Sequence, residues 1–157
     1  MTQHIVAIAN EKGGVGKTTT AINLSHALAL NNLKVLVVDL DPQGNLTQGY
    51  GIPIDRIEKS VCDLIMDREL PIEQAIYKGS DLDLICATPN LARVERELFA
   101  ITNGELRLAR RLYEIRAKYD VILIDVPPTF GTLLNSALNA ARWLILPLDA
   151  GVFALTG

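Results

Sequence analysis

A glycine-rich stretch near the start of the sequence carries the residues best suited to chemistry. Residues 11–18 read EKGGVGKT and match the phosphate-loop pattern G-x-x-x-x-G-K-[ST], except that Glu11 replaces the first glycine. In such a loop the glycines bring backbone N–H groups close to phosphate. Lys17 can then reach the β- and γ-phosphates, and the Thr18 hydroxyl can bind Mg²⁺. The other interpretation is a glycine-rich turn with an incidental lysine.

Three aspartates stand where a magnesium site beside such a loop would need a carboxylate. Asp125 follows four apolar residues in VILID, and Asp39 and Asp41 end the run VLVVDLD. Ligands of α/β sheets bind at the carboxyl ends of the strands, and residues two apart in a strand share a face. Any one of these aspartates could instead cap a helix or form a turn. All three at strand ends favour a site for a metal-bound phosphate.

Apolar runs and helical patterns predict the elements that position these residues. Buried strands are expected over residues 4–10, 34–41, 82–87, 120–128 and 143–149, and helices over 18–30, 60–66, 71–77, 91–101, 105–118 and 133–141. Ser60 is expected to cap the second helix, and residues 42–53, rich in Gly and Pro, to form a loop. Because the strands have no polar face, we expect an α/β domain whose mainly parallel sheet is flanked by helices on both faces.

The composition excludes several classes of protein. The 157 residues are enough for one domain, and a net charge of −3 gives no overall basic field for nucleic acid. No apolar run is long enough to span a membrane, and the first residues lack a signal-peptide pattern. Cys62 and Cys86 have no C-x-x-C partner, which favours buried thiols in a reducing cytoplasm over a zinc site. His4 and His26 are expected to be structural.

At these motifs the sequence resembles the ParA/MinD family of P-loop ATPases. KGGVGKTTT is similar to that family's deviant Walker A motif, in which a signature lysine, here Lys12, precedes the glycines. VVDLDPQGN resembles the Walker A′ segment, YDVILIDVPPTFG resembles Walker B and switch II, and WLILPLDAGVFALTG resembles the strand and loop beyond. The form DPQGN is typical of the partition branch, so the resemblance is to ParA/Soj-type proteins. Arg142 departs from it, since relatives often carry an acidic residue there.

The sequence is shorter than those of the family that it resembles. Members of the family are commonly about a hundred residues longer. The resemblance therefore implies that residues 1–157 are one P-loop NTPase domain, either an amino-terminal fragment or a shortened form, without the C-terminal strands. An apolar strand over residues 143–149 would lie exposed at the sheet edge unless a further portion or another chain covers it.

The resemblance implies a role for each motif residue. Asp41 would position or activate the attacking water, and Asp39 would support both the metal and its loop. Residues 129–131 would belong to a switch loop that senses the γ-phosphate. The implied nucleotide contacts are Gly13, Gly14, Val15, Gly16, Lys17, Thr18 and Thr19, the metal site Thr18, Asp39 and Asp125, and the catalytic residues Lys12, Lys17 and Asp41.

Lys12 has the role most particular to the family. The resemblance implies that it reaches the γ-phosphate of a second subunit, so that nucleotide state controls assembly of a homodimer. From the residues alone, Lys12 could also fold onto the phosphates of its own chain or point into solvent.

A cluster of cationic residues allows two interpretations. Arg107, Arg110 and Arg111 share one face of a predicted helix, with Arg116 and Lys118 close behind. They could contact DNA phosphates or a partner, but the negative net charge favours a solvated helix face. Association with DNA therefore rests on the resemblance.

The resemblance implies a cytoplasmic, nucleoid-associated ATPase of chromosome or plasmid partition. Its cofactors would be ATP/ADP and Mg²⁺, and its partners a second copy when ATP is bound, nonspecific DNA and a ParB-like protein that stimulates hydrolysis, with no membrane. One alternative is a nucleotide-binding interaction module with negligible turnover. A MinD-like cell-division regulator would need a C-terminal amphipathic helix, and residues 1–157 show none. A reductase like the nitrogenase iron protein would need cysteines in a glycine-rich setting, and Cys62 and Cys86 do not occupy one.

Overall fold

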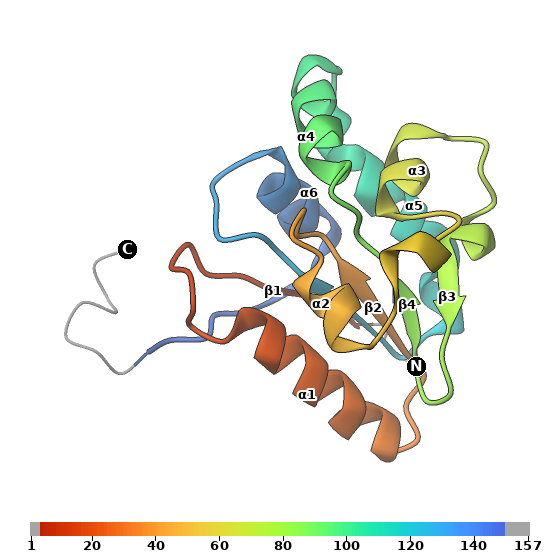
Figure 1. Ribbon diagram of the computed structural model, residues 1–157, viewed down its shortest axis with the longest axis vertical. Helices are drawn as coiled ribbons and strands as arrows, with labels where there is room; N and C mark the ends of the chain where they lie inside the picture. Colours follow the sequence, from red (N-terminus) through yellow and green to blue (C-terminus); the bar gives the residue numbers. More distant parts are fainter. Residues whose placement is uncertain (1–3, 150–157) are drawn as a thin grey trace.

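A computed structural model describes residues 4–149, which fold around one six-stranded sheet (Figure 1). The strand order is β3-β4-β2-β5-β1-β6. Every neighbouring pair is parallel except β3 with β4, which is antiparallel. The strands are β1 (His4–Ile8), β2 (Val35–Asp39), β3 (Ile76–Lys78), β4 (Asp83–Ile85), β5 (Val121–Asp125) and β6 (Trp143–Ile145).

Helices cover both faces of the sheet. The longer ones are α1 (Lys17–Leu30), α2 (Asn45–Gly49), α3 (Val61–Met66), α4 (Leu91–Ala100), α5 (Arg107–Ile115) and α6 (Thr132–Ala140). Short 3₁₀ turns are η1 (Ile54–Arg56), η2 (Ile72–Ala75), η3 (Gly104–Leu106) and η4 (Arg116–Lys118). Alternate residues of the strands pack against α1 and α2 on one face and against α3 to α6 on the other, which gives two apolar cores. The predicted α/β class with a mainly parallel sheet is confirmed.

The elements of the site form largely where the sequence predicts them. Each of the five expected strands is present in a shorter form, and Ser60 caps α3 through a capping box with Asp63. The segment 42–53 is not wholly a loop, because α2 forms within it. The helix expected over 105–118 is interrupted, with 3₁₀ turns before and after α5.

The helix expected over 71–77 is wrong. Residues 72–75 form only one 3₁₀ turn, and Ile76 then starts β3, which pairs with β4. Ile76 and Tyr77 are β-branched and aromatic residues that suit a strand. A helix of seven residues would also have left the sheet edge at β4 without a partner.

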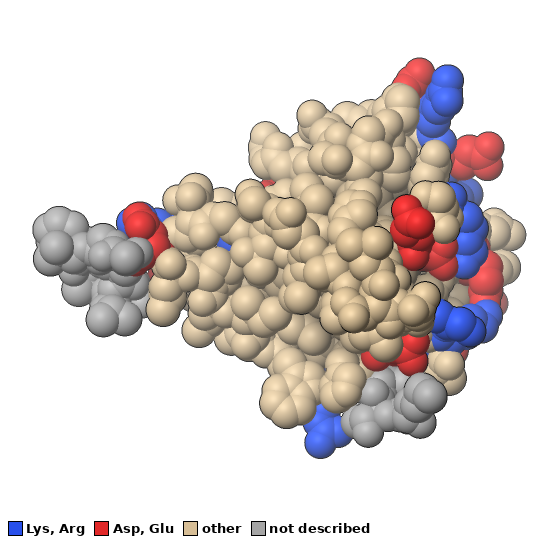
Figure 2. Space-filling view, turned by 90° about the horizontal axis from the view of Figure 1, so that it is seen from below, with Lys and Arg blue, Asp and Glu red and all other residues tan. Residues whose placement is uncertain are grey.

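Charged side chains are unevenly distributed over the face of the molecule seen from below (Figure 2). Seen from below, Lys, Arg, Asp and Glu gather at the side of β3, while most of the remaining surface in this view carries no charge (Figure 2). Helix α1 contributes to this pattern, since its only charged residue is the buried Lys17. Within residues 4–149, no helix is long and apolar enough to cross a membrane.

Candidate functional site

The glycine-rich loop joins β1 to α1 and places two residues in the left-handed region of backbone space. Gly14 has a φ of 76° and Gly16 a φ of 88°. A Cβ added at either position would meet no atom within 4 Å, so backbone conformation rather than lack of space favours glycine there. Lys17 opens α1 and is only 7% exposed, and its Nζ donates to the Lys12 carbonyl at 3.2 Å. The ammonium group thus lies against the loop whose N–H groups were expected to hold phosphate.

Asp125 lies next to this loop because of the strand order. Strand β5 runs between β1 and β2, and Asp125 is in register with Ile8 of β1 and Asp39 of β2. The Thr18 hydroxyl donates to Asp125 Oδ2 at 2.7 Å. A residue at the start of α1 and a residue at the end of β5 are thereby joined, 107 positions apart in the sequence.

The second oxygen of Asp125 is buried without a hydrogen-bond partner among the described residues. Burial, opposed by the Thr18 hydrogen bond and reinforced by the charges of Asp39 and Asp41, raises the pKa of Asp125 to about 7. A buried carboxylate in this state would gain stability from a cation placed against it.

Magnesium fits this pair of residues. A carboxylate oxygen and a hydroxyl are ligands of the kind Mg²⁺ prefers, and the orphaned Oδ1 of Asp125 is available for one contact. Residues 4–149 contain no group of three or more His, Cys, Asp or Glu that could enclose a metal. Mg²⁺ that keeps waters and binds substrate phosphates needs no such enclosure.

Asp39 faces the same side of the sheet but has a different set of contacts. It is fully buried, and its carboxylate accepts from the Thr47 amide at 2.8 Å, the Thr47 hydroxyl at 2.7 Å and the Asp41 amide at 3.1 Å. Burial raises its pKa although these bonds oppose the change. Both oxygens are therefore engaged in fixing the turn from β2 into α2. Direct metal ligation by Asp39 would require one of these bonds to be exchanged.

Thr47 is a residue that the sequence reasoning missed. Its hydroxyl donates to Asp39 and also accepts from the Ala87 amide at 3.1 Å, which ties α2 to the end of β4. The signal in the sequence was a threonine inside the segment 42–53, which was expected to form a loop. Asp41 lies at the start of this segment and is itself buried, with Oδ1 accepting from the Gln43 amide at 2.9 Å.

Known proteins resemble the chain in both sequence and fold. A family model for an AAA domain matches residues 3–157. The chain belongs to this AAA-domain family. It is 44% identical over 156 residues to the sporulation initiation inhibitor protein Soj of Bacillus subtilis and 42% identical over 155 residues to the chromosome partitioning protein ParA of Myxococcus xanthus. These relatives make it a ParA/Soj-type member.

The matches cover 98% of this chain but only 61% of the Soj protein and 54% of the ParA protein. Among solved structures, cobyrinic acid a,c-diamide synthase of Mycobacterium smegmatis, bound to an ATP analogue and magnesium, is 35% identical with a TM-score of 0.92. That match covers 98% of this chain and 63% of the other. A plasmid partition protein of Borrelia burgdorferi is 30% identical with a TM-score of 0.85, over 99% of this chain and 69% of the other.

In this ParA/Soj-type chain Lys12 lies at the exposed surface of the loop. The Lys12 amide donates to Asn10 Oδ1 at 2.8 Å, and its Nζ lies 3.5 Å from Asp149 in an ion pair whose side chains are 51% and 60% exposed. Asn10, which the sequence reasoning also missed, donates to the Pro147 carbonyl at 2.7 Å and holds the loop against the segment after β6. An exposed pair of this kind is worth only about 0–1 kcal/mol, so Lys12 can exchange it for another anion.

The remaining candidate residues lie as follows. Gly13 and Thr19 are exposed at the loop and on the first turn of α1, and residues 129–130 are exposed before α6. Both cysteines are free and buried, as expected, and burial raises the pKa of Cys62 and brings that of Cys86 to about 12.

The expectation of a solvated arginine face is wrong for Arg111. This residue is 9% exposed and donates to the carbonyls of Arg68, at 3.2 Å, and Leu70. It anchors the segment after α3 onto α5, a role that helical spacing alone does not reveal.

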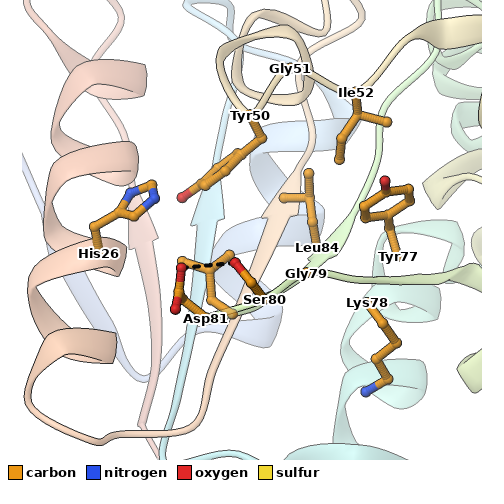
Figure 3. Close-up of a pocket in the computed structure, with 11 residues that line it drawn as sticks. His26, Tyr50, Gly51, Ile52, Tyr77, Lys78, Gly79, Ser80, Asp81 and Leu84 are labelled. Carbon is orange, nitrogen blue, oxygen red and sulfur yellow. Dashed lines mark hydrogen bonds between the residues drawn. The ribbon is translucent and has the colours of Figure 1, made fainter.

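A cavity of about 380 Å³ lies on the α1 face, between α1, the end of α2 and the turn that joins β3 to β4 (Figure 3). His26 stacks on Tyr50 at one side of it, with ring centroids 5.3 Å apart, and Tyr77 lies at the other. Its lining residues include none of the glycine-rich loop. It is therefore separate from the phosphate site.

Proposed function

We propose that residues 1–157 form the nucleotide-binding domain of a ParA-like ATPase that acts in chromosome or plasmid partition. The observation that carries this proposal is the Thr18–Asp125 hydrogen bond, which joins the start of α1 to the end of β5 beside the glycine-rich loop. The orphaned oxygen of Asp125 supports a place for a cation there. ATP or ADP with Mg²⁺ is the ligand that this arrangement fits best.

The chain's own residues divide the work of binding. The N–H groups of residues 13–16 and the positive end of α1 hold the phosphates, and Lys17 leaves the Lys12 carbonyl to contact the β- and γ-phosphates. Thr18 and Asp125 hold Mg²⁺, which when bound neutralises charge on the phosphate oxygens. Thr19 lies one residue further along the first turn, toward the α-phosphate.

Asp41 is the residue we propose for hydrolysis. It is buried at the carboxyl end of β2, and the Asp39–Thr47 bonds fix the turn that carries it. From there it orients the water that attacks the γ-phosphate. Residues 129–131, ahead of α6, sense whether the γ-phosphate is present.

We propose that Lys12 couples nucleotide to assembly. Its exposed position and weak pair with Asp149 leave its ammonium group free to contact the γ-phosphate held by a second copy. ATP would then favour a homodimer that associates with DNA without sequence preference in the cytoplasm, at the nucleoid and not at a membrane. A ParB-like partner would stimulate hydrolysis and return the chain to its ADP-bound form.

Single-turnover hydrolysis of radiolabelled ATP with Mg²⁺ tests the catalytic part. We expect slow conversion to ADP by the natural sequence. Asp41→Ala should bind ATP with little change and lose about 10²-fold or more in rate, because positioning of the attacking group contributes at least this much. Asp55→Ala, at an exposed aspartate far along the chain, is the matched control.

Two other results would change the proposal. If Asp41→Ala hydrolysed ATP at the rate of the natural sequence, the role of Asp41 would be wrong. If the natural sequence bound Mg·ATP and gave no ADP in a single turnover, the domain would be a nucleotide-binding interaction module instead.

A further inference from the structure

Four arginines surround a small cavity on the face of the sheet opposite α1. The cavity has a volume of about 170 Å³ and is lined by Ile65, Arg68, Arg107, Arg110, Arg111 and Glu114. The residues from α5 lie at spacings of three and four, on one face of the helix. The other two come from α3 and from the segment that follows it. We call these six residues the arginine pocket.

The positive charge of the arginine pocket is only partly balanced. Glu114 is its single acidic residue, and both of its oxygens accept from Arg111 Nη1, at 2.9 and 3.1 Å. Over residues 4–149, no carboxylate forms an ion pair with Arg68, Arg107 or Arg110. The guanidinium groups of Arg68, Arg107 and Arg110 therefore line one small cavity without an ion-pair partner among the described residues.

The state of Arg107 reflects this arrangement. Its Nε is buried without a hydrogen-bond partner among the described residues, and its Nη1 makes two long contacts, 3.4 Å to the Ile65 carbonyl and 3.9 Å to Met66 Sδ. Burial first, and then the charges of Arg68 and Arg110, lower its pKa. An anion in the pocket would relieve this repulsion and satisfy the free donors.

We propose that the arginine pocket binds a single terminal phosphoryl group, as in orthophosphate or a phosphate monoester. The planar donors of arginine match the oxygens of phosphate in pairs. The volume is below the range of about 300–1,000 Å³ for sites that hold whole small molecules, so one phosphoryl group fits and a nucleotide does not.

Two features favour a terminal phosphoryl group over the backbone of DNA. The site is a concavity with Glu114 in its wall, whereas binding along a duplex uses an extended basic surface. The pocket also stands apart from the nucleotide site, because α5 packs on one core of the sheet and α1 on the other. The proposal is therefore independent of the function proposed above.

Titration with sodium phosphate, followed by NMR of the arginine Nε–Hε signals, tests the pocket directly. We expect saturable shifts for Arg68, Arg107 and Arg110 that sodium chloride of equal ionic strength does not produce. In the double variant Arg68→Gln and Arg110→Gln the shifts at Arg107 should need about a hundredfold more phosphate, since two charge-assisted hydrogen bonds are lost and each is worth about one decade. Within residues 4–149 neither side chain makes a hydrogen bond or an ion pair, and both are exposed, so the variant should keep the natural spectrum elsewhere.

Three results would overturn the proposal. Equal shifts with sodium chloride would mean general screening, and an unchanged titration in the double variant would place phosphate elsewhere. If a short DNA duplex moved the same signals at a concentration of DNA phosphate groups much lower than the concentration of free phosphate required, that result would assign the pocket to the nucleic-acid backbone. Binding at the glycine-rich loop cannot mimic any of these, because the signals belong to the pocket arginines.

Discussion

At the scale of single residues, Asp125 has the environment that most clearly departs from an ordinary surface carboxylate. It is buried at the end of β5, one oxygen bonds Thr18 and the other has no partner among the described residues. The pKa of about 7 follows from burial and from the neighbouring Asp39 and Asp41. Without a cation, this carboxylate is a cost to the fold that binding can remove.

That cost predicts a pH dependence of stability. The pKa of Asp125 is raised from 3.8 in the unfolded chain to about 7 in the native one, so between these values the native state holds the extra proton. The contribution of Asp125 to the free energy of unfolding is fully present below about pH 4 and is lost as pH rises toward 7. Asp125→Asn does not titrate, and above pH 7 it should be more stable than the natural chain by on the order of 1–4 kcal/mol.

Urea unfolding at several pH values, without nucleotide, measures this difference. Asp55→Asn, at an exposed position, is the control and should follow the natural chain throughout. A free-energy difference between Asp125→Asn and the natural chain that stayed constant from pH 4 to pH 8 would contradict the assigned environment. Saturating Mg·ADP should diminish or reverse the advantage of the variant, because the cation stabilises the carboxylate.

At the scale of elements, Thr47 joins three parts of the site. It links α2 to the end of β2 through Asp39 and to the end of β4 through the Ala87 amide. Thr47→Val keeps the shape of the side chain and removes the hydroxyl. We expect a loss of about 1–3 kcal/mol of unfolding free energy, because Asp39 and the Ala87 amide each lose a partner while buried.

Urea unfolding of three variants checks this prediction. Thr47→Ser keeps the hydroxyl and should recover most of the loss, and Thr102→Val at an exposed position should be close to neutral. Equal stability of Thr47→Val and Thr47→Ser would show that the hydroxyl does not hold these elements together.

The elements also show what the sequence could and could not predict. Strands such as Val121–Asp125 were predictable because an uninterrupted apolar run can only be buried on both faces of a sheet. The glycine-rich loop was predictable because its backbone needs positive φ angles, which glycine adopts readily. Strand β3 was not, since its three residues are too few to show an alternating pattern, although it pairs with β4, the next strand along the chain.

Contacts that the local sequence pattern does not specify account for the residues missed in the site. Nothing near Thr47 in the sequence indicates that Asp39 will be its partner, and nothing near Arg111 indicates the carbonyls of Arg68 and Leu70. The positions of Asp39 and Asp125 at strand ends were predictable. Their different hydrogen-bond partners were not: those of Asp39 engage both of its oxygens, whereas Asp125 keeps one oxygen without a partner among the described residues.

At the scale of the whole molecule, the two edges of the sheet differ. Strand β3 protects one edge by being short and by carrying Lys78. At the other edge Trp143 is 53% exposed, and Leu144, Leu146 and Leu148 are also exposed in the described part of the chain. Apolar side chains gathered in this way suit contact with further polypeptide, either a further portion of the same chain or another chain.

The glycine-rich loop lies at this second edge. Asn10 contacts the Pro147 carbonyl and Lys12 lies by Asp149, so Lys12 and the exposed apolar segment share one side of the molecule. The chain spans about three fifths or less of its curated relatives, and assembly on this side remains part of the proposed function.

Sedimentation equilibrium with Mg²⁺ and either a non-hydrolysable ATP analogue or ADP tests most directly whether nucleotide controls assembly through Lys12. The natural chain should double in mass with the ATP analogue and not with ADP. Lys12→Ala should bind the analogue with similar affinity and stay monomeric, while Lys34→Ala, an exposed lysine before β2, should behave as the natural chain. A Lys12→Ala dimer in the ATP-analogue state, or a natural chain that stays monomeric although it binds the analogue, would contradict the account.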